Sequence, residues 1–352
     1  MKEHLFPYSW TLKDAVFTKD KGTVFSCFAC GGGSTMGYKL AGFDVIGCNE
    51  TDPKMMECYI ANHNPKYSYL EPMQTFKNRT DLHDELYSLD ILDGSPPCSS
   101  FSMAGNREKD WGKEKKFREG QQKQVLDTLF FDFIDLAKKL QPKVVIAENV
   151  KGLLLGNAKE YVRNIYREFD LAGYYVQHFL LDASKMGVPQ RRERVFFIAM
   201  RKDIAAPFLV QKDMFTVVPK LELDFKERVI VFGEIADRKD TAKNMPESCF
   251  KEWVKMGEKS GSLSLVHDKG SFFNEIKLSE FEVSDTLTSQ GKLYHFSIPR
   301  RVNKSEVCCI STFPQDYNFI NSHSYYVSGM SVPPVMTAQI ATKIYDQWIS
   351  KF

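Results

Sequence analysis

Cys98 is the first candidate for chemistry, because it follows two prolines in the segment 94–102, GSPPCSSFS. A cysteine thiolate is a strong nucleophile when the chain holds it in a suitable environment. The glycine and the prolines end the apolar run 89–92 and fix a turn at the carboxyl end of a predicted strand, where open α/β sheets bind ligands. This segment taken alone fits a nucleophile and a small buried core thiol equally well.

Glu50 and the glycines at 31–33 indicate a nucleoside site at the ends of the first two predicted strands. Met36 and Tyr38 stand where the dinucleotide and P-loop patterns require glycine and lysine, so no phosphate anchor is evident. A carboxylate at a strand end can accept hydrogen bonds from two ribose hydroxyls. The alternative is that Glu50 is a charge at the amino end of the helix that begins after Asp52.

Glu148 directly follows the apolar run 143–147 and is therefore a candidate proton donor or charge-assisted hydrogen-bond partner. The alternative is an acid that caps the next turn. In QRRER at 190–194, an extended backbone would place Arg192 and Arg194 on one face, where two guanidiniums suit a phosphate or a base carbonyl. A solvated basic turn is the better explanation of this motif taken alone.

Alternating strand and helix signals predict the elements that position these residues. The predicted strands are 23–29, 44–48, 67–70, 89–92, 143–147, 174–181 and 194–200, and the predicted helices start at Pro53 or span 125–140, 159–171 and 337–349. This alternation is typical of an α/β fold with a doubly wound, mostly parallel sheet covered on both faces. Residues 201–300 lack long apolar runs and indicate a smaller irregular domain.

Composition narrows the protein class. The chain has 352 residues, 43% of them hydrophobic, a net charge of +2 and eight irregularly spaced cysteines. We therefore expect a cytoplasmic protein without a disulfide framework, and no membrane span, because no run of 18 apolar residues occurs. Cys27 and Cys30 have no second pair at matching spacing, so we expect no metal. Any nucleic-acid surface must come from local clusters of basic residues.

Taken together, the motifs resemble the cytosine-C5 DNA methyltransferase family in order and spacing over nearly the whole chain. The segments that carry the resemblance are FACGGGSTMG at 28–37, PCSSFS at 97–102, TLFF at 128–131, Glu148-Asn149-Val150, QRRER at 190–194 and SGMSV at 328–332. Ser26 stands where the family usually has aspartate, Cys30 replaces a loop glycine, and Met330 replaces an asparagine.

The resemblance implies a Rossmann-like methyltransferase that uses S-adenosylmethionine. It implies a catalytic and cofactor-binding domain at 1–200, a target-recognition domain at 201–317, and a C-terminal segment, 318–352, that returns to the catalytic domain. The implied cofactor-binding residues are Phe28, Ala29, Cys30, Gly32, Gly33, Glu50, Thr51, Pro97, Leu129 and Ser331.

The implied reaction is methylation at C5 of a cytosine flipped out of double-stranded DNA. Cys98 would add to C6, and Glu148 would hold or protonate N3. Arg194, supported by Arg192, would bind the O2 edge or hold the loop. The implied substrate-binding residues are Pro97, Ser102, Asn149 and Gln190. We expect a bacterial or phage monomer whose cognate restriction endonuclease, where one exists, is a functional and not a physical partner.

Two alternatives remain open on the sequence. Ser95-Pro96-Pro97-Cys98 also resembles the tRNA cytosine-C5 branch of the family, although its Cys-Phe-Thr signature is not found here. A nucleic-acid-binding relative that has lost catalysis is the other alternative, and the presence of Cys98, Glu148 and Arg194 argues against it. The basic segment 103–124, with a net charge of +3 from seven basic and four acidic residues, is predicted to be a flap that contacts the phosphate backbone.

Overall fold

The computed structural model describes residues 4–97, 114–115, 124–125, 128–155, 158–213 and 216–352. The described chain divides into two compact units. The sheet unit comprises 17–181, 193–224 and 340–352, and the second unit comprises the N-terminal residues to Val16, 182–192 and 225–339. Cys98, Ser102 and most of the predicted flap lie outside the described residues. The predicted domain boundaries at 200 and 317 stay predictions.

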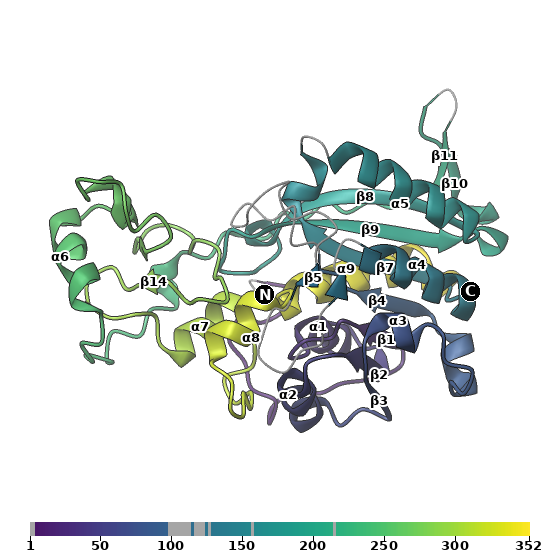
Figure 1. The fold of residues 1–352 in the computed structure, drawn as a ribbon, viewed down its shortest axis with the longest axis horizontal. Helices are drawn as coiled ribbons and strands as arrows, with labels where there is room; N and C mark the ends of the chain where they lie inside the picture. Colours follow the sequence, from purple (N-terminus) through teal and green to yellow (C-terminus); the bar gives the residue numbers. More distant parts are fainter. Residues whose placement is uncertain (1–3, 98–113, 116–123, 126–127, 156–157, 214–215) are drawn as a thin grey trace. The chain divides into compact units, whose positions relative to one another are not determined.

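The sheet unit contains a seven-stranded sheet in the order β3-β2-β1-β4-β7-β9-β8 (Figure 1). Its strands are β1 Thr23–Cys27, β2 Asp44–Glu50, β3 Tyr67–Leu70, β4 Ile91–Gly94, β7 Val144–Val150, β8 Tyr174–Asp182 and β9 Glu193–Arg201. The pairs β1–β2, β2–β3, β1–β4 and β4–β7 are parallel, and β7–β9 is antiparallel. The predicted α/β fold with a mostly parallel sheet is therefore confirmed.

Strand order reverses beside β1, because β2 follows on one side and β4 on the other. Such a switch point opens a crevice at the carboxyl ends of the strands, where doubly wound sheets bind ligands. The predicted strand 89–92 is displaced in the structure, since β4 runs from Ile91 to Gly94. Asp93 and Gly94 consequently belong to the strand and not to the turn before Cys98.

Helices connect the strands of the sheet unit. They are α1 Gly33–Leu40, α2 Pro53–His63, α3 Met73–Phe76, α4 Leu129–Leu140 and α5 Lys159–Leu171. Alternation along β1 separates two environments, as the pleat requires. Phe25 and Cys27 join the main core with α3, α4 and α5, whereas Ser26 bonds to a network that includes Tyr38 of α1. As predicted, Asp52 caps α2, accepting hydrogen bonds from the backbone N–H groups of Lys54 and Met55.

Shorter elements complete the chain. Two antiparallel pairs join β5 Glu114–Lys115 with β6 Gln124–Val125 and β10 Leu209–Gln211 with β11 Val217–Pro219. Short 3-10 helices span Asp84–Ser88, Lys151–Leu154, Ala183–Lys185, Lys202–Ile204, Ala206–Phe208, Phe232–Glu234, Leu263–Leu265 and Ile349–Lys351. None of the described helices combines the length and apolar character needed to cross a bilayer.

The second unit is built mainly from loops, short strands and helices. Three two-residue strands, β12 Gly261–Ser262, β13 Ile276–Lys277 and β14 Leu293–Tyr294, form one sheet. The helices are α6 Glu247–Met256, α7 Lys304–Ser311 and α8 Ser324–Met330, and α9 Pro334–Gln347 crosses the boundary between the units. Two small apolar clusters support this unit, which fits the weak apolar periodicity of its sequence.

Candidate active site

The glycine loop between β1 and α1 has an unusual backbone. Phe28, Cys30 and Gly32 all adopt positive φ angles, of 53°, 48° and 86°. Alternation of this kind turns backbone N–H groups toward one side of a loop, where they can bind a ligand. Gly32 is the N-cap of α1, and a Cβ at that position would overlap the imidazole of His63. The loop therefore requires glycine at position 32 for both its conformation and its packing.

Glu50 fixes the glycine loop to the end of β2. One carboxylate oxygen accepts a hydrogen bond from the Cys30 backbone N–H at 2.7 Å, and the other accepts from Thr51 and Asp52 at 2.7 and 2.8 Å. Burial raises the pKa of Glu50 above its usual value, and the three backbone donors oppose that shift. The carboxylate predicted to bind a ribose is therefore already hydrogen-bonded to the backbone of the glycine loop and of the residues after β2.

Asp93 is a buried acid that the sequence reasoning missed. Its carboxylate accepts hydrogen bonds from the Ser26 hydroxyl at 2.9 Å and the Tyr38 hydroxyl at 3.0 Å, and the residue is only 4% exposed. Burial raises its pKa to about 7; the two hydroxyl donors oppose this shift and the charge of Glu148 adds to it. The signal was present, because Asp93 ends an apolar strand just as Glu50 and Glu148 do.

Glu148 and Arg194 form an ion pair between the antiparallel strands β7 and β9. The Arg194 Nε atom lies 2.9 Å from a Glu148 carboxylate oxygen, and both side chains are mostly buried. Burial lowers the pKa of Arg194, and the neighbouring Glu148 acts in the opposite direction. Arg194 also donates to the Glu193 carbonyl at 2.8 Å. The ion pair with Arg194 thus fixes the position of the Glu148 carboxylate, which the sequence predicts to be catalytic.

Asn149 secures the segment that leads to Cys98. Its side-chain amide donates to the Pro96 carbonyl at 3.1 Å, and its own carbonyl oxygen accepts from the Val150 N–H at 2.9 Å. Asn149 is 4% exposed, and Pro97 is half-buried at the end of the described segment. Only Pro97 therefore lies between Pro96, the residue that Asn149 contacts, and the predicted nucleophile Cys98.

Three other predicted site residues bind backbone groups of the second unit. Arg192 donates to the carbonyls of Leu287, Gly329 and Ser331 at 2.9–3.1 Å. Gln190 donates to the Ile310 carbonyl and accepts from the Leu287 N–H, while the Ser331 hydroxyl donates to the Val327 carbonyl. Their spacing suggested that Arg192 and Arg194 would act together on one face. In the structure Arg192 contacts backbone carbonyls, whereas Arg194 pairs with Glu148.

The remaining predicted cofactor residues lie around the glycine loop. Leu129 begins α4 and is buried in the main core, and Phe28 packs against the same core. Ala29 belongs to a small apolar cluster with Cys48, Met56 and Tyr59. Gly33 is buried at the start of α1, and Thr51 follows Glu50 at the end of β2. Phe28, Ala29 and Gly33 thus belong to the glycine loop or its junction with α1, while Thr51 follows β2 and Leu129 starts α4.

Arg300 and Glu306 form a buried ion pair in the second unit, and the sequence did not single them out. Both residues are fully buried, and the guanidinium donates to both carboxylate oxygens at 2.6 and 2.9 Å. Asn303 caps α7 through the Glu306 N–H, and Glu306 returns a bond to the Asn303 N–H. The Asn-x-x-Glu spacing is the detectable signal, because it is that of a capping box.

Charged residues near the glycine loop fit a cationic cofactor without phosphate. Segment 28–33 carries no charge, and the acids at or just after the ends of β2, β4 and β7 are Glu50, Asp52, Asp93 and Glu148. Lys151, which follows β7, is paired with Glu193. Carboxylates repel phosphate and attract a sulfonium. The residues present therefore fit S-adenosylmethionine. Within the described ranges, no group of three or more His, Cys, Asp or Glu side chains is placed to hold a metal ion.

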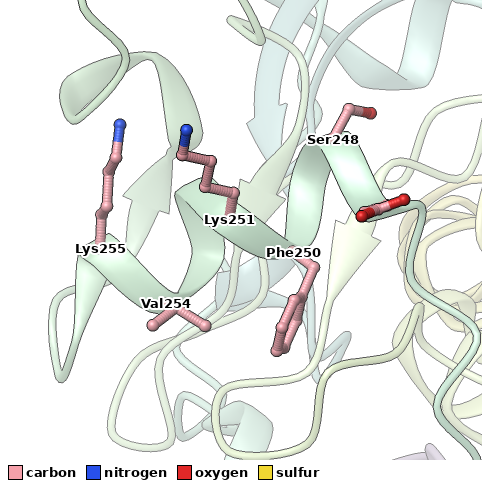
Figure 2. A pocket seen from close by; sticks show the side chains of 6 residues that line it. Ser248, Phe250, Lys251, Val254 and Lys255 are labelled. Carbon is pink, nitrogen blue, oxygen red and sulfur yellow. The ribbon is translucent and has the colours of Figure 1, made fainter.

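A surface hollow of about 770 Å³ lies on α6 of the second unit (Figure 2). Figure 2 shows Phe250 and Val254 pointing away from the lysines of the same helix, Lys251 and Lys255. The lining residues include none of the predicted catalytic, substrate-binding or cofactor-binding positions. This hollow therefore shares no residue with the predicted site.

Comparison with known proteins gives concordant matches. A family model described as C-5 cytosine-specific DNA methylase matches residues 22–346. The Type II methyltransferase M.NgoPII of Neisseria gonorrhoeae is 29% identical over 353 residues, covering 91% of this chain and 94% of the relative. M.FnuDI of Fusobacterium nucleatum, also a Type II methyltransferase, is 38% identical over 181 residues, covering 51% of this chain and 47% of the relative.

Two solved structures share the fold. One is a protein encoded within an E. coli prophage, with a TM-score of 0.63, 20% identity, and coverage of 92% of this chain and 99% of that chain. The other is a DNMT2 variant from Spodoptera frugiperda, with a TM-score of 0.61, 17% identity, and coverage of 92% and 99%. At these identities, the two structures support the α/β architecture alone.

Proposed function

This chain belongs to the family of C-5 cytosine-specific DNA methylases, and from that premise we propose that it transfers a methyl group from S-adenosylmethionine to C5 of a flipped cytosine in a specific duplex DNA sequence. The sequence-similar relatives are Type II methyltransferases, which favours DNA over tRNA as the substrate. A cognate restriction endonuclease would act as a functional partner, and the methyltransferase itself would act as a monomer.

The observation that carries this proposal is the arrangement at the ends of β4 and β7. Arg194 holds Glu148 at 2.9 Å, and the next residue, Asn149, holds the Pro96 carbonyl at 3.1 Å. One strand end thus carries the acid and also anchors the segment that precedes Cys98. This coupling supports a site in which the nucleophile and the acid act on the same ring.

The chemistry follows from the low reactivity of cytosine at C5. The Cys98 thiolate adds to C6, and Glu148 binds N3 and stabilises the charge that develops in the ring, which makes C5 nucleophilic. When bound, S-adenosylmethionine would supply an electrophilic methyl group to C5 and would be left as neutral S-adenosylhomocysteine. Removal of the C5 proton by a base and elimination of the Cys98 thiolate from C6 then restore the aromatic ring.

The arginines of QRRER have separate roles in this proposal. Arg194 orients Glu148 through its Nε atom, which supports a role close to the base. Arg192 and Gln190 fix backbone segments around Leu287, Ile310 and Ser331, and so act on substrate binding by shaping the second unit. The target-recognition role of the second unit belongs to the same proposal.

Methyl transfer from labelled cofactor to duplex DNA and to tRNA tests the function directly. We expect incorporation into duplex DNA that contains the recognition sequence, and a Cys98→Ser variant that binds DNA without methylating it. Cys249→Ser is the matched control, because Cys249 lies on α6 of the second unit and is not one of the predicted site residues. Labelling of tRNA alone, or of DNA by the Cys98→Ser protein, would refute the proposal; unlabelled DNA with normal DNA binding would favour the inactive relative.

A further inference from the structure

Asp93 occupies a special position beside the glycine loop. It precedes Gly94 at the carboxyl end of β4, and its two carboxylate oxygens accept from Ser26 of β1 and Tyr38 of α1. In the parallel β1–β4 pair, Ser26 and Asp93 are direct partners in register. The carboxylate therefore joins the strand before the glycine loop to the helix after it.

Ser26 makes this contact informative. The family resemblance places an aspartate at this position of β1, and here a serine stands there with an aspartate directly across the strand pair. The Ser26 hydroxyl and the Asp93 carboxylate are 2.9 Å apart. The strand pair therefore still carries one buried acid, but on β4 and not on β1. An exchange of the two residues would leave the charge within the same buried network.

The surroundings of Asp93 leave its charge uncompensated. The groups around it are Ser26 and Cys27 of β1, Tyr38 of α1, Tyr59 of α2 and Glu148 of β7. None of these described groups is cationic, and Arg194 is committed to Glu148. A buried carboxylate without a cationic partner is unstable in its charged form, and a cation bound nearby would stabilise it.

We propose that Asp93 is a positioning residue for the cofactor: its carboxylate replaces the acid that β1 lacks at Ser26 and selects cationic S-adenosylmethionine over S-adenosylhomocysteine, whose sulfur is uncharged. This inference rests on the proposed function, because it assumes that cofactor. Asp93 acts by charge and by holding the loop between Ser26 and Tyr38, and it takes no part in the bond changes at cytosine.

Proton linkage follows from this assignment. The pKa of Asp93 is about 7 without cofactor, so near neutral pH a substantial fraction of the protein carries a protonated Asp93. A bound sulfonium favours the ionised form, so binding releases the proton. Affinity for S-adenosylmethionine should therefore rise with pH from about 6 to 8, by up to about tenfold for one linked proton.

Calorimetry on the unmodified full-length protein tests this linkage without any variant. Titration with S-adenosylmethionine at pH 6.5, in two buffers of different ionisation enthalpy, measures the protons released. We expect greater release than with S-adenosylhomocysteine, and a dissociation constant that falls as the pH rises. Equal proton release with both ligands and equal pH slopes would overturn the inference, whereas failure of both ligands to bind would refute the proposed function itself.

Asp93→Asn is the direct variant, because it keeps the shape and removes the charge. We expect it to lose affinity for S-adenosylmethionine about tenfold, to lose less for S-adenosylhomocysteine, and to lose the pH slope. Asp90→Asn is the matched control on the same segment: Asp90 pairs with Lys143 at 2.7 Å and precedes the other end of β4. If Asp93→Asn lowers the affinity for both ligands equally, Asp93 has only a structural role and the inference is overturned.

The exchanged pair Ser26→Asp with Asp93→Ser tests whether the charge can move across the strand pair. We expect the double variant to recover most of the affinity and ligand preference that Asp93→Ser alone loses. Ligand preference is measured by the shift in melting temperature with each ligand, so methylation activity is not needed. A folded double variant that shows no recovery would overturn the claim that Asp93 replaces the acid missing at Ser26.

Discussion

At the residue scale, the site depends on a few buried polar contacts that fix charge in place. Glu148, Glu50 and Asp93 are all acids at the carboxyl ends of strands, yet each has a different partner. Glu148 has an arginine, Glu50 has backbone N–H groups, and Asp93 has two hydroxyls. Since a cation, a dipole and a neutral donor stabilise a carboxylate to different degrees, one strand-end pattern produces three different groups.

Arg194 should be required for catalysis through its hold on Glu148. We expect Arg194→Ala to lower the single-turnover methylation rate about a hundredfold, because the carboxylate loses the contact that orients it toward the base. Lys151→Ala is the control, since Lys151, the residue after β7, pairs with Glu193 of β9 at 2.8 Å in an exposed position. Similar rates in the two variants would show that the ion pair does not orient the acid.

Asp93 should also set how stability changes with pH. Its pKa of about 7 in the folded protein lies above the usual value of 3.8, so between these values the folded state holds the proton more tightly. Stability contributed by that proton is present below about pH 4 and is lost as the pH rises to about 7, amounting to at most about 4 kcal/mol. Urea denaturation of Asp93→Asn should show a smaller decline across this window than the unmodified protein. A parallel decline in both would contradict the assignment.

At the scale of elements, much of the architecture could be predicted and several contacts could not. The strand 67–70 and the helix 159–171 occur with the predicted bounds, because turn residues and apolar periodicity mark their ends. Asp93 was missed because the neighbouring glycine and prolines suggested that the strand had already ended. From the sequence, Arg192 and Gln190 are expected to contact a ligand. In the structure they donate to backbone carbonyls that are distant in the chain, and a sequence does not show which distant carbonyls a long side chain reaches.

Gly32 offers a test of the element that carries the glycine loop. A Gly32→Ala side chain would overlap His63 and would also require a φ of 86°, so we expect a loss of about 2–4 kcal/mol in the free energy of unfolding. Gly173→Ala separates the two effects: Gly173 has a φ of 92°, and nothing lies within 4 Å of an added Cβ. Chemical denaturation should therefore show a clearly smaller loss for Gly173→Ala, and equal losses would exclude the steric contribution.

At the scale of the whole molecule, the roles proposed for cofactor binding and DNA recognition belong to different units. The sheet unit contains Glu50, Asp93, Glu148 and the glycine loop, while the second unit contains residues 225–339 and its own apolar clusters. Arg192 and Arg194 lie on opposite sides of the boundary, with Arg192 in the second unit and Arg194 in the sheet unit. A substitution that destabilises only one unit should consequently lower the affinity for one ligand, cofactor or DNA, more than for the other.

Glu306→Gln is the variant that tests this division. It leaves the buried Arg300 guanidinium without its carboxylate partner, and loss of one member of a buried pair costs about 3–5 kcal/mol. We expect weaker binding of duplex DNA, because the proposed recognition surface belongs to the second unit, and nearly unchanged affinity for S-adenosylmethionine. Calorimetry with cofactor and gel-shift titration with DNA measure the two affinities, and Gly32→Ala should give the reverse pattern. An equal loss of affinity for cofactor and for DNA in Glu306→Gln would mean that the two units do not bind their ligands independently. Disruption of a buried ion pair in the second unit would then have weakened cofactor binding in the sheet unit.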